Sequence, residues 1–235
     1  MCSPAMANFE IKHPFRSTRL VYRAFEDTGD DRKWYDEMIW KDALAFPLNS
    51  GNLLRPQNRK LSDKAFDSYL EDALAVFICL PRSSDATANV EDGETAHTTT
   101  KDTPENRSNL EHIGVLTLDG GSDEDFQHRN MFLTITVTER YRNQGFGREA
   151  LDWAVDWAFR QAGMHSVALN TVEYNRRARH LYESVGFALE GRHRQGHYFD
   201  RQWWDIVLYS MLEHEWEALR GLRREDRGRV GALDP

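Results

Sequence analysis

Residues 142–148 of the chain read Arg142-Asn143-Gln144-Gly145-Phe146-Gly147-Arg148. An alternating run at 132–137 predicts a strand just before them, and from Gly147 onward apolar residues recur at helical spacing. Glycines in a turn between a strand and a helix let backbone N–H groups approach a ligand closely. The helix start adds unpaired donors and the positive end of its dipole. The turn is therefore typical of a cradle for a diphosphate group.

Outward from this turn, the hydrophobic pattern predicts a mixed α/β domain. Strands are predicted at 19–25, 74–80, 113–118, 132–137 and 167–172, with a closing hairpin over 187–192 and 203–211. Helical spacing predicts helices at about 31–43, 62–74, 147–162, 175–185 and 212–219. An antiparallel meander that precedes strand–helix alternation favours a mixed sheet over a uniform array of parallel strands.

Composition divides the chain into one domain with less ordered additions. We expect a loose leader over 1–16, a single domain over 17–220 and a flexible tail over 221–235. Segment 82–112 holds seven acidic and three basic residues and no aromatic residue. Because it cannot bury enough apolar surface to offset its ordering entropy, we expect a disordered acidic insertion between two strands.

Charge and cysteine content exclude several classes of protein. The 235 residues include 30 basic and 38 acidic ones, which gives a net charge of −8 and a pI near 5.6, so no nucleic-acid partner is expected. We find neither an apolar run long enough to span a membrane nor a secretory signal. Two cysteines are too few for a disulfide framework or a metal cage. The sequence predicts a soluble cytoplasmic protein without a metal.

A dinucleotide site is an alternative for the glycine-rich turn. Gly145, Gly147 and Ala150 fit the spacing of the dinucleotide fingerprint, and Glu173 is a candidate for its ribose-binding acid. However, the loop 138–144 is too long for the tight turn that the fingerprint needs. Glu173 lies 28 residues after Gly145 instead of about 20, and too little chain follows for a second nucleotide-binding half. The fingerprint is therefore disfavoured.

Two motifs resemble those of the GNAT acyltransferases, which bind the pyrophosphate of acetyl-CoA. They are Arg142-x-x-Gly145-x-Gly147 and, thirty residues on, Asn175-x-x-Ala178-x-x-Leu181-Tyr182-x-x-x-Gly186-Phe187. Within the family the chain is most similar to the branch with Rim-type ribosomal-protein N-terminal acetyltransferases and spermidine acetyltransferases. Further matches are at 17–23, 190–192 and 204–212. The resemblance covers about residues 17–217, apart from the acidic insertion.

This resemblance implies a fold, a co-substrate and a reaction. The fold would be a twisted mixed sheet of about seven strands, the fourth and fifth splayed apart, with four or more flanking helices. Acetyl-CoA would bind through Ile135, Thr136, Val137, Arg142, Asn143, Gln144, Gly145, Phe146, Gly147, Arg148, Asn175 and Tyr182. An amine would then attack the thioester directly in a ternary complex. A catalytically silent module that binds CoA as a sensor or scaffold is the alternative.

The resemblance also assigns roles in catalysis. Tyr182 would protonate the leaving thiolate, although it also fits a core aromatic on an apolar helix face. Asn170 occupies the place where N-terminal acetyltransferases of the family often carry a glutamate, and it would position a water. Glu173 or Glu139 would act as base through water, unless each is a solvated surface carboxylate.

Other candidate features receive structural interpretations. His193 and His197 lack a third metal ligand, and Trp153 and Trp157 are expected to pack or to contact a partner. Asp119 and the run 123–125 form an acidic turn that is either solvated or steers a cationic amine. The expected acceptor is a small-molecule amine or a protein N-terminus, with no membrane partner, and a homodimer is left open.

Overall fold

The computed structural model describes residues 14–42, 48, 56, 58–82, 109–121 and 126–222. Most of the predicted leader, acidic insertion and tail lies outside these residues. The insertion ends earlier than predicted, because residues 110–112 already belong to a strand and pair with residues 79–81. The predicted boundary at 112 is therefore too late by three residues.

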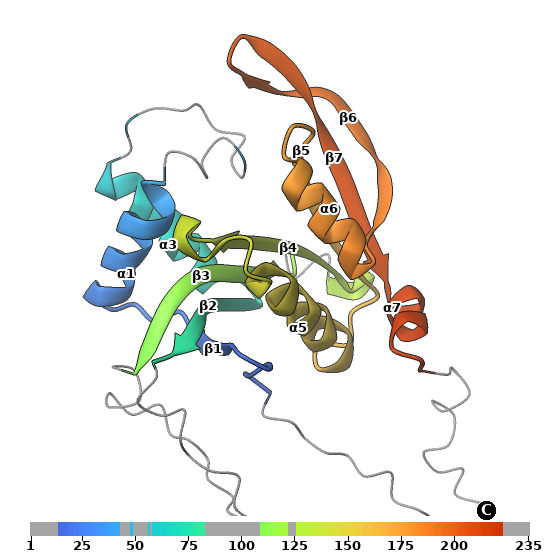
Figure 1. The fold of residues 1–235 in the computed structure, drawn as a ribbon, viewed down its shortest axis with the longest axis horizontal. Coiled ribbons are helices and arrows are strands. Elements are labelled where there is room, and N and C mark those ends of the chain that lie inside the picture. The colour runs from blue at the N-terminus through green and yellow to red at the C-terminus, as the bar shows by residue number, and fades with distance from the viewer. Residues whose placement is uncertain are drawn as a thin grey trace, which may run out of the picture.

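Seven strands form one mixed sheet in the order β1-β2-β3-β4-β5-β7-β6 (Figure 1). The strands are β1 (Val21–Ala24), β2 (Leu74–Pro81), β3 (Leu110–Asp119), β4 (Asn130–Val137), β5 (Ser166–Val172), β6 (Ala188–Phe199) and β7 (Gln202–Leu212). All neighbours are antiparallel except β4 and β5, which are parallel. The prediction of a mixed sheet of about seven strands is confirmed.

Five α-helices and three shorter helical turns accompany the described part of this sheet. They are α1 (Gly29–Tyr35), the π-helical turn η1 (Asp36–Trp40), α3 (Arg59–Leu70), the 3-10 turns η2 (Phe126–His128) and η3 (Glu139–Tyr141), α5 (Phe146–Arg160), α6 (Arg176–Val185) and α7 (Glu213–Leu219). None of the helices over the described ranges is long and apolar enough to cross a membrane.

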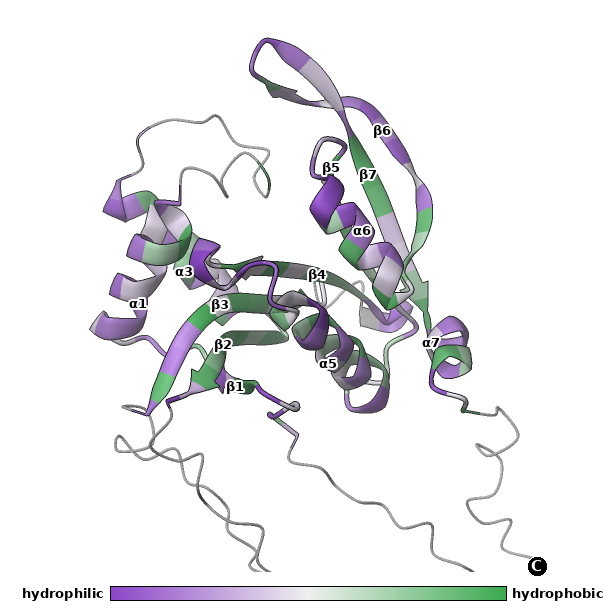
Figure 2. Cartoon of the chain, viewed as in Figure 1, coloured by the Kyte–Doolittle hydropathy of each residue, from purple (hydrophilic) through white to green (hydrophobic). Residues whose placement is uncertain are grey.

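Both faces of the sheet are packed, because successive side chains of a strand point to opposite faces. Val76 and Ile78 of β2 belong to the larger apolar cluster, which includes the buried side of α5. Phe77 and Cys79 belong to a second cluster with residues of α1 and α3. Figure 2 shows the central strands as largely hydrophobic, whereas α6 is largely hydrophilic on its outer side.

The two parallel strands separate soon after they begin. β4 and β5 pair only at Asn130, Met131 and Phe132 of β4, and beyond Phe132 the β4 edge has no β5 partner. The strands diverge visibly in Figure 1, with β5 turning toward the β6–β7 hairpin. The predicted splay is confirmed, and it opens a wedge at the centre of the sheet.

Candidate functional site

A turn rich in free backbone donors joins β4 to α5. Gly145 is the N-cap of α5 with φ 84°, and Asn143 also has a positive φ, 61°. Glycine adopts this left-handed conformation without the steric cost that a side chain would bring. Within the described residues, the N–H groups of 143–148 donate to no acceptor. Six neighbouring donors at a helix start form a ready site for a phosphate group.

This turn borders a cavity of about 290 Å³. Ten of the twelve residues predicted to bind acetyl-CoA line it, namely Ile135, Thr136, Val137, Arg142, Asn143, Gly145, Gly147, Arg148, Asn175 and Tyr182. The other two, Gln144 and Phe146, do not line the cavity and instead make contacts within or next to the turn. The Gln144 side-chain amide donates to the Arg140 carbonyl at 2.8 Å, and the Arg19 guanidinium lies 4.4 Å above the buried Phe146 ring.

The Arg142 side chain braces the turn from within. Its Nε donates to the Val137 carbonyl at 2.8 Å, and its Nη2 forms a 2.7 Å ion pair with Asp42. The guanidinium is thus already engaged, and it holds the end of β4 against the turn. The backbone N–H groups remain as donors at the turn, and the exposed Arg148 and Arg177 lie at the rim of the cavity.

Ser17 and Arg19, near the start of the described residues, also hold the turn in place through Glu149 of α5. The Glu149 carboxylate accepts hydrogen bonds from Ser17 Oγ at 2.7 Å and from the Arg19 backbone N–H at 2.6 Å, and it pairs with Arg19 Nε at 2.7 Å. Arg19 Nη1 also donates to the Gln144 carbonyl at 3.1 Å. The segment 17–23, which resembles the family in sequence, therefore also holds this turn in place, a contact between residues more than 120 positions apart that no local pattern indicates.

A smaller cavity of about 100 Å³ continues from the first into the wedge between the splayed strands. Ile135 and Tyr182 line both cavities. The smaller cavity also borders Phe132 of β4, Asn170 of β5 and His197 of β6. The two cavities are adjacent, and their linings extend from the donor-rich turn to the centre of the sheet, so we refer to the pair as the path.

Tyr182 lies where the two cavities meet. Its side chain is 8% exposed, and its ring packs near Phe187 and Tyr209, with centroids 6.3 and 5.9 Å away. Burial raises the pKa of Tyr182 to about 12. The hydroxyl has no hydrogen-bond partner among the described residues. Tyr182 is thus both a core aromatic and a cavity-lining residue, and the two predicted interpretations do not exclude each other.

Asn175 and Asn170 are held in place by the backbone around them. Asn175 is the N-cap of α6, and its Oδ1 accepts from the Ala178 N–H at 3.2 Å. Asn170 pairs with Leu208 of β7, and its exposed side chain lines the smaller cavity. An amide at this position can hold a water but cannot accept a proton from it.

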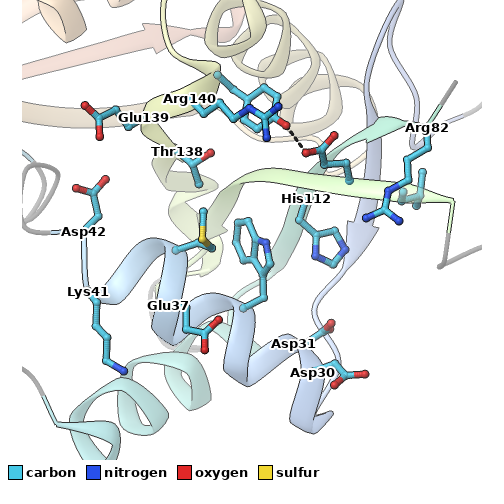
Figure 3. Close-up of a pocket in the computed structure, with 15 residues that line it drawn as sticks. Asp30, Asp31, Glu37, Lys41, Asp42, Arg82, His112, Thr138, Glu139 and Arg140 are labelled. Atoms are coloured by element: carbon cyan, nitrogen blue, oxygen red, sulfur yellow. Dashed lines mark hydrogen bonds between the residues drawn. The ribbon is translucent and has the colours of Figure 1, made fainter.

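The two carboxylates predicted as bases lie elsewhere. Glu173 forms a 2.5 Å ion pair with Arg192 and lines neither cavity of the path. Glu139 belongs to η3 and faces a separate cavity of about 860 Å³ between η3 and the first helix, together with Asp42 and Lys41 (Figure 3). The structure therefore does not bring either carboxylate to Tyr182, because an ion pair and a helical turn direct them away.

The remaining predicted features have structural roles or lie outside the described residues. Trp153 stacks on Tyr22 with ring centroids 3.6 Å apart, and its Nε1 donates to the Pro14 carbonyl. Asp119 accepts from the Gly121 N–H at 2.8 Å, and residues 123–125 are not described. The described ranges contain no cluster of three side chains suited to hold a metal ion.

His197 is the residue of this path that sequence reasoning assigned to structure alone. It is 6% exposed and lines the smaller cavity, whereas His193, four residues earlier, is exposed. The register of β6 against β7 is irregular between these two histidines. The i, i+4 spacing of the two histidines does not indicate that one of them is buried and lines the cavity.

The sequence matches a known family and several characterised relatives. Residues 101–187 match the Acetyltransferase (GNAT) family. Spermidine N(1)-acetyltransferase of Vibrio cholerae is 25% identical over 92 residues, which are 39% of this chain and 53% of that protein. The [ribosomal protein uS5]-alanine N-acetyltransferase of Escherichia coli is 27% identical over 85 residues, 36% of this chain and 44% of that protein. The chain thus spans about half the length of these relatives.

Solved structures extend the likeness over most of the fold. A spermidine N-acetyltransferase from Vibrio cholerae in complex with CoA and spermine superimposes with a TM-score of 0.62 at 17% identity, over 85% of this chain and 99% of that one. A GNAT-family acetyltransferase from Bacillus anthracis gives a TM-score of 0.59 at 15% identity, over 85% and 98%. The sequence match to the acetyltransferase (GNAT) family over residues 101–187 and the fold shared with solved acetyltransferases therefore point to the same family.

Proposed function

We propose that the chain transfers an acetyl group from acetyl-CoA to a primary amine by direct attack in a ternary complex. The observation that carries this proposal is the pair of adjacent cavities with shared walls. The larger one borders six backbone N–H groups that have no acceptor among the described residues, the smaller one lies in the wedge between β4 and β5, and Tyr182 lines both. A long ligand with a diphosphate at one end and a reactive group at the other fits such a path.

The charge of the cavity rim supports a polyanionic ligand. The chain carries a net charge of −8, yet the rim of the larger cavity bears Arg148, Arg177 and His180. Arg177 reaches across to Asn143 of the turn, with Nη1 3.4 Å from Oδ1. A local excess of basic groups on an acidic protein favours a ligand with several phosphates.

The edge of β4 from which β5 separates supports binding of an extended, amide-bearing arm. Beyond Phe132, β3 is the one described strand that pairs with β4. An extended chain such as the pantetheine arm of CoA would lie along this edge, where Ile135 and Val137 line the larger cavity. The thioester would then lie beside Tyr182, where the path narrows into the smaller cavity.

The reaction needs a neutral amine and a proton for the leaving thiolate. An amine with an ordinary pKa of about 10.4 is mostly protonated at pH 7, so its deprotonation opposes the reaction by about 4–5 kcal/mol. Tyr182 keeps its proton at neutral pH, because burial raises its pKa to about 12, and it would supply that proton as the C–S bond breaks. The acceptor class would be a small cationic amine or a protein N-terminus, as the names of the relatives suggest.

Calorimetry and a thiol-release assay test this proposal. Acetyl-CoA should bind the purified chain, and CoA should be released faster than hydrolysis when spermidine or a short peptide with a free N-terminus is added. Gly145→Val should weaken acetyl-CoA binding, because residue 145 needs φ 84° and a side chain there would crowd the free N–H groups. Failure of the wild-type chain to bind CoA would overturn the proposal.

A silent CoA-binding module is the second candidate, and the amide at Asn170 is the observation that favours it. Such a module would bind CoA but would release none from acetyl-CoA with any amine of the panel. The thiol-release assay therefore separates the two functions.

A further inference from the structure

The proposed reaction leaves one role without a residue, the acceptor of the amine proton. Asn170 is an amide, Glu173 is paired with Arg192, and Glu139 faces another cavity. Among the described residues that line the smaller cavity, none is a carboxylate or a lysine. The titratable groups at its walls are Tyr182 and His197.

The bend of β6 places His197 at this cavity. Five residues of β6, from His193 to His197, lie opposite only three of β7, from Trp204 to Ile206. Gln195 at the centre of this irregularity has φ 52°, and its N–H donates to Asp205 Oδ1 at 2.9 Å. The strand bulges here, and the His197 ring is buried against the wedge while His193 remains exposed.

A hydrogen bond orients the His197 ring. Its Nε2 lies 3.1 Å from the Tyr174 hydroxyl, and the Tyr174 ring is itself fixed by Trp204 and Phe199, with centroids 5.1 and 5.7 Å away. Nδ1 of His197 has no hydrogen-bond partner among the described residues, and it is not one of the fully buried polar atoms that lack a partner. Nδ1 is therefore accessible, in a side chain that lines the smaller cavity. If Nε2 carries the hydrogen shared with Tyr174, Nδ1 presents a lone pair.

The surroundings of His197 keep the ring neutral. Burial lowers its pKa below the ordinary value, and no charged side chain contributes to the shift. Glu173, in the turn after β5, and Asp205 of β7 both pair with Arg192, at 2.5 and 3.7 Å. The groups that face the ring from the β5–α6 turn and from α6 are the phenols of Tyr174 and Tyr182, whose pKa values burial raises. A neutral imidazole at neutral pH is ready to take a proton.

We propose that His197 accepts the proton of the attacking amine, with Tyr174 as the positioning residue that fixes its tautomer. This inference rests on the proposed acetyl transfer. The nitrogen of a neutral amine attacks the thioester carbonyl carbon and forms the C–N bond. One hydrogen of that nitrogen, made acidic by the new bond, passes to His197 Nδ1. The C–S bond then breaks, and the thiolate sulfur takes the proton of the Tyr182 hydroxyl. Solvent afterwards reprotonates Tyr182 and deprotonates His197.

The test compares His197→Asn with His193→Asn, its matched control on the same strand. The turnover number kcat is measured from pH 5 to pH 9 at saturating acetyl-CoA and spermidine or peptide, because kcat reports groups of the bound complex. The wild-type kcat should show one ionisation with a midpoint below about 6.5, in addition to the rise toward pH 9 that comes from deprotonation of the amine itself. His197→Asn should lower kcat by about 10²-fold and abolish the ionisation below 6.5, with the rise from the amine and the acetyl-CoA affinity unchanged. His193→Asn should behave as wild type.

Retention of the acidic limb and of near-normal turnover in His197→Asn would overturn the inference and leave the proposed function intact. Absence of acetyl-CoA binding or of CoA release in the wild type would instead overturn the proposed function. If His197→Asn does not fold, the His197 pKa in the CoA complex is measured by NMR in the wild type and in Tyr174→Phe. The inference requires that this pKa match the midpoint of the kcat profile and that both move together in Tyr174→Phe. A mismatch would refute it.

Discussion

Replacement of Tyr182 by phenylalanine removes one hydroxyl group from the junction of the two cavities and keeps the ring. The ring is 8% exposed and packs near Phe187 and Tyr209, and the hydroxyl has no hydrogen-bond partner among the described residues. Since no hydrogen bond is lost, the free energy of unfolding should change by less than about 1 kcal/mol. The affinity for acetyl-CoA should change little, because the ring still lines the cavity.

Turnover should fall by about 10²–10⁴-fold in Tyr182→Phe if proton transfer to sulfur limits the rate. The thiol of CoA has an ordinary pKa of about 8.5, roughly 3.5 units below the value of about 12 for Tyr182. Transfer from Tyr182 to a free thiolate is therefore uphill by about 5 kcal/mol, and this cost adds to the barrier of the step. The same high pKa keeps the phenol protonated, and the wild-type rate should not decline between pH 7 and pH 10 through loss of this proton.

Tyr209→Phe is the matched control, because this neighbouring tyrosine lines neither cavity. The Tyr209 hydroxyl bonds Glu183 at 2.8 Å and Arg179 at 3.3 Å, so its loss should lower stability by about 1–2 kcal/mol and leave turnover within a few fold. Thermal unfolding, calorimetry and the thiol-release assay together check both variants. Wild-type turnover in Tyr182→Phe would refute the role of this residue as an acid.

Three further outcomes are expected. Gly145→Val should weaken acetyl-CoA binding at least tenfold in calorimetry, because φ 84° costs a side-chain-bearing residue about 1–2 kcal/mol and the new side chain crowds the free donors. Arg142→Ala should weaken binding less than Gly145→Val does, since its guanidinium is already held by Val137 and Asp42, and equal or greater loss would contradict this ranking. Burial first, and the nearby Arg23 second, lower the pKa of His112 to about 4. Between pH 6.5 and pH 4 the imidazole of His112 is therefore protonated in the unfolded chain but not in the folded one. As the pH is lowered over this range, the free energy of unfolding should fall by up to about 3 kcal/mol more in the wild type than in His112→Gln, as measured by denaturant unfolding.

Local patterns predicted much of the fold. The alternation at 132–137 and the helical spacing from Gly147 correspond to β4 and α5, and Gly145 and Asn175 begin the two helices around the cavity. Each of these features depends on residues that are close together in sequence, so the sequence of that segment alone is enough to predict it. The splay of β4 and β5 followed from the family resemblance, since no single segment encodes where two strands part.

The catalytic surroundings were less predictable because they depend on distant contacts. Glu173 is held by Arg192, nineteen residues further on, and this pair removes it from the cavity. Glu139 belongs to the 3-10 turn η3 and lines another cavity, and the hydrophobic pattern does not predict this turn. His197 reaches the wedge only because β6 bulges at Gln195, and a bulge leaves no mark in the hydrophobic pattern.

The most direct test of the central claim follows the fate of the acetyl group. The purified chain is incubated with acetyl-CoA and, separately, with spermidine and a short peptide bearing a free N-terminus, and both CoA release and the mass of the amine are recorded. The account predicts CoA release above hydrolysis and, in step with it, one added acetyl group on the nitrogen of at least one of these amines. Tight binding of acetyl-CoA with no acetylated amine would contradict the claim of an acetyltransferase.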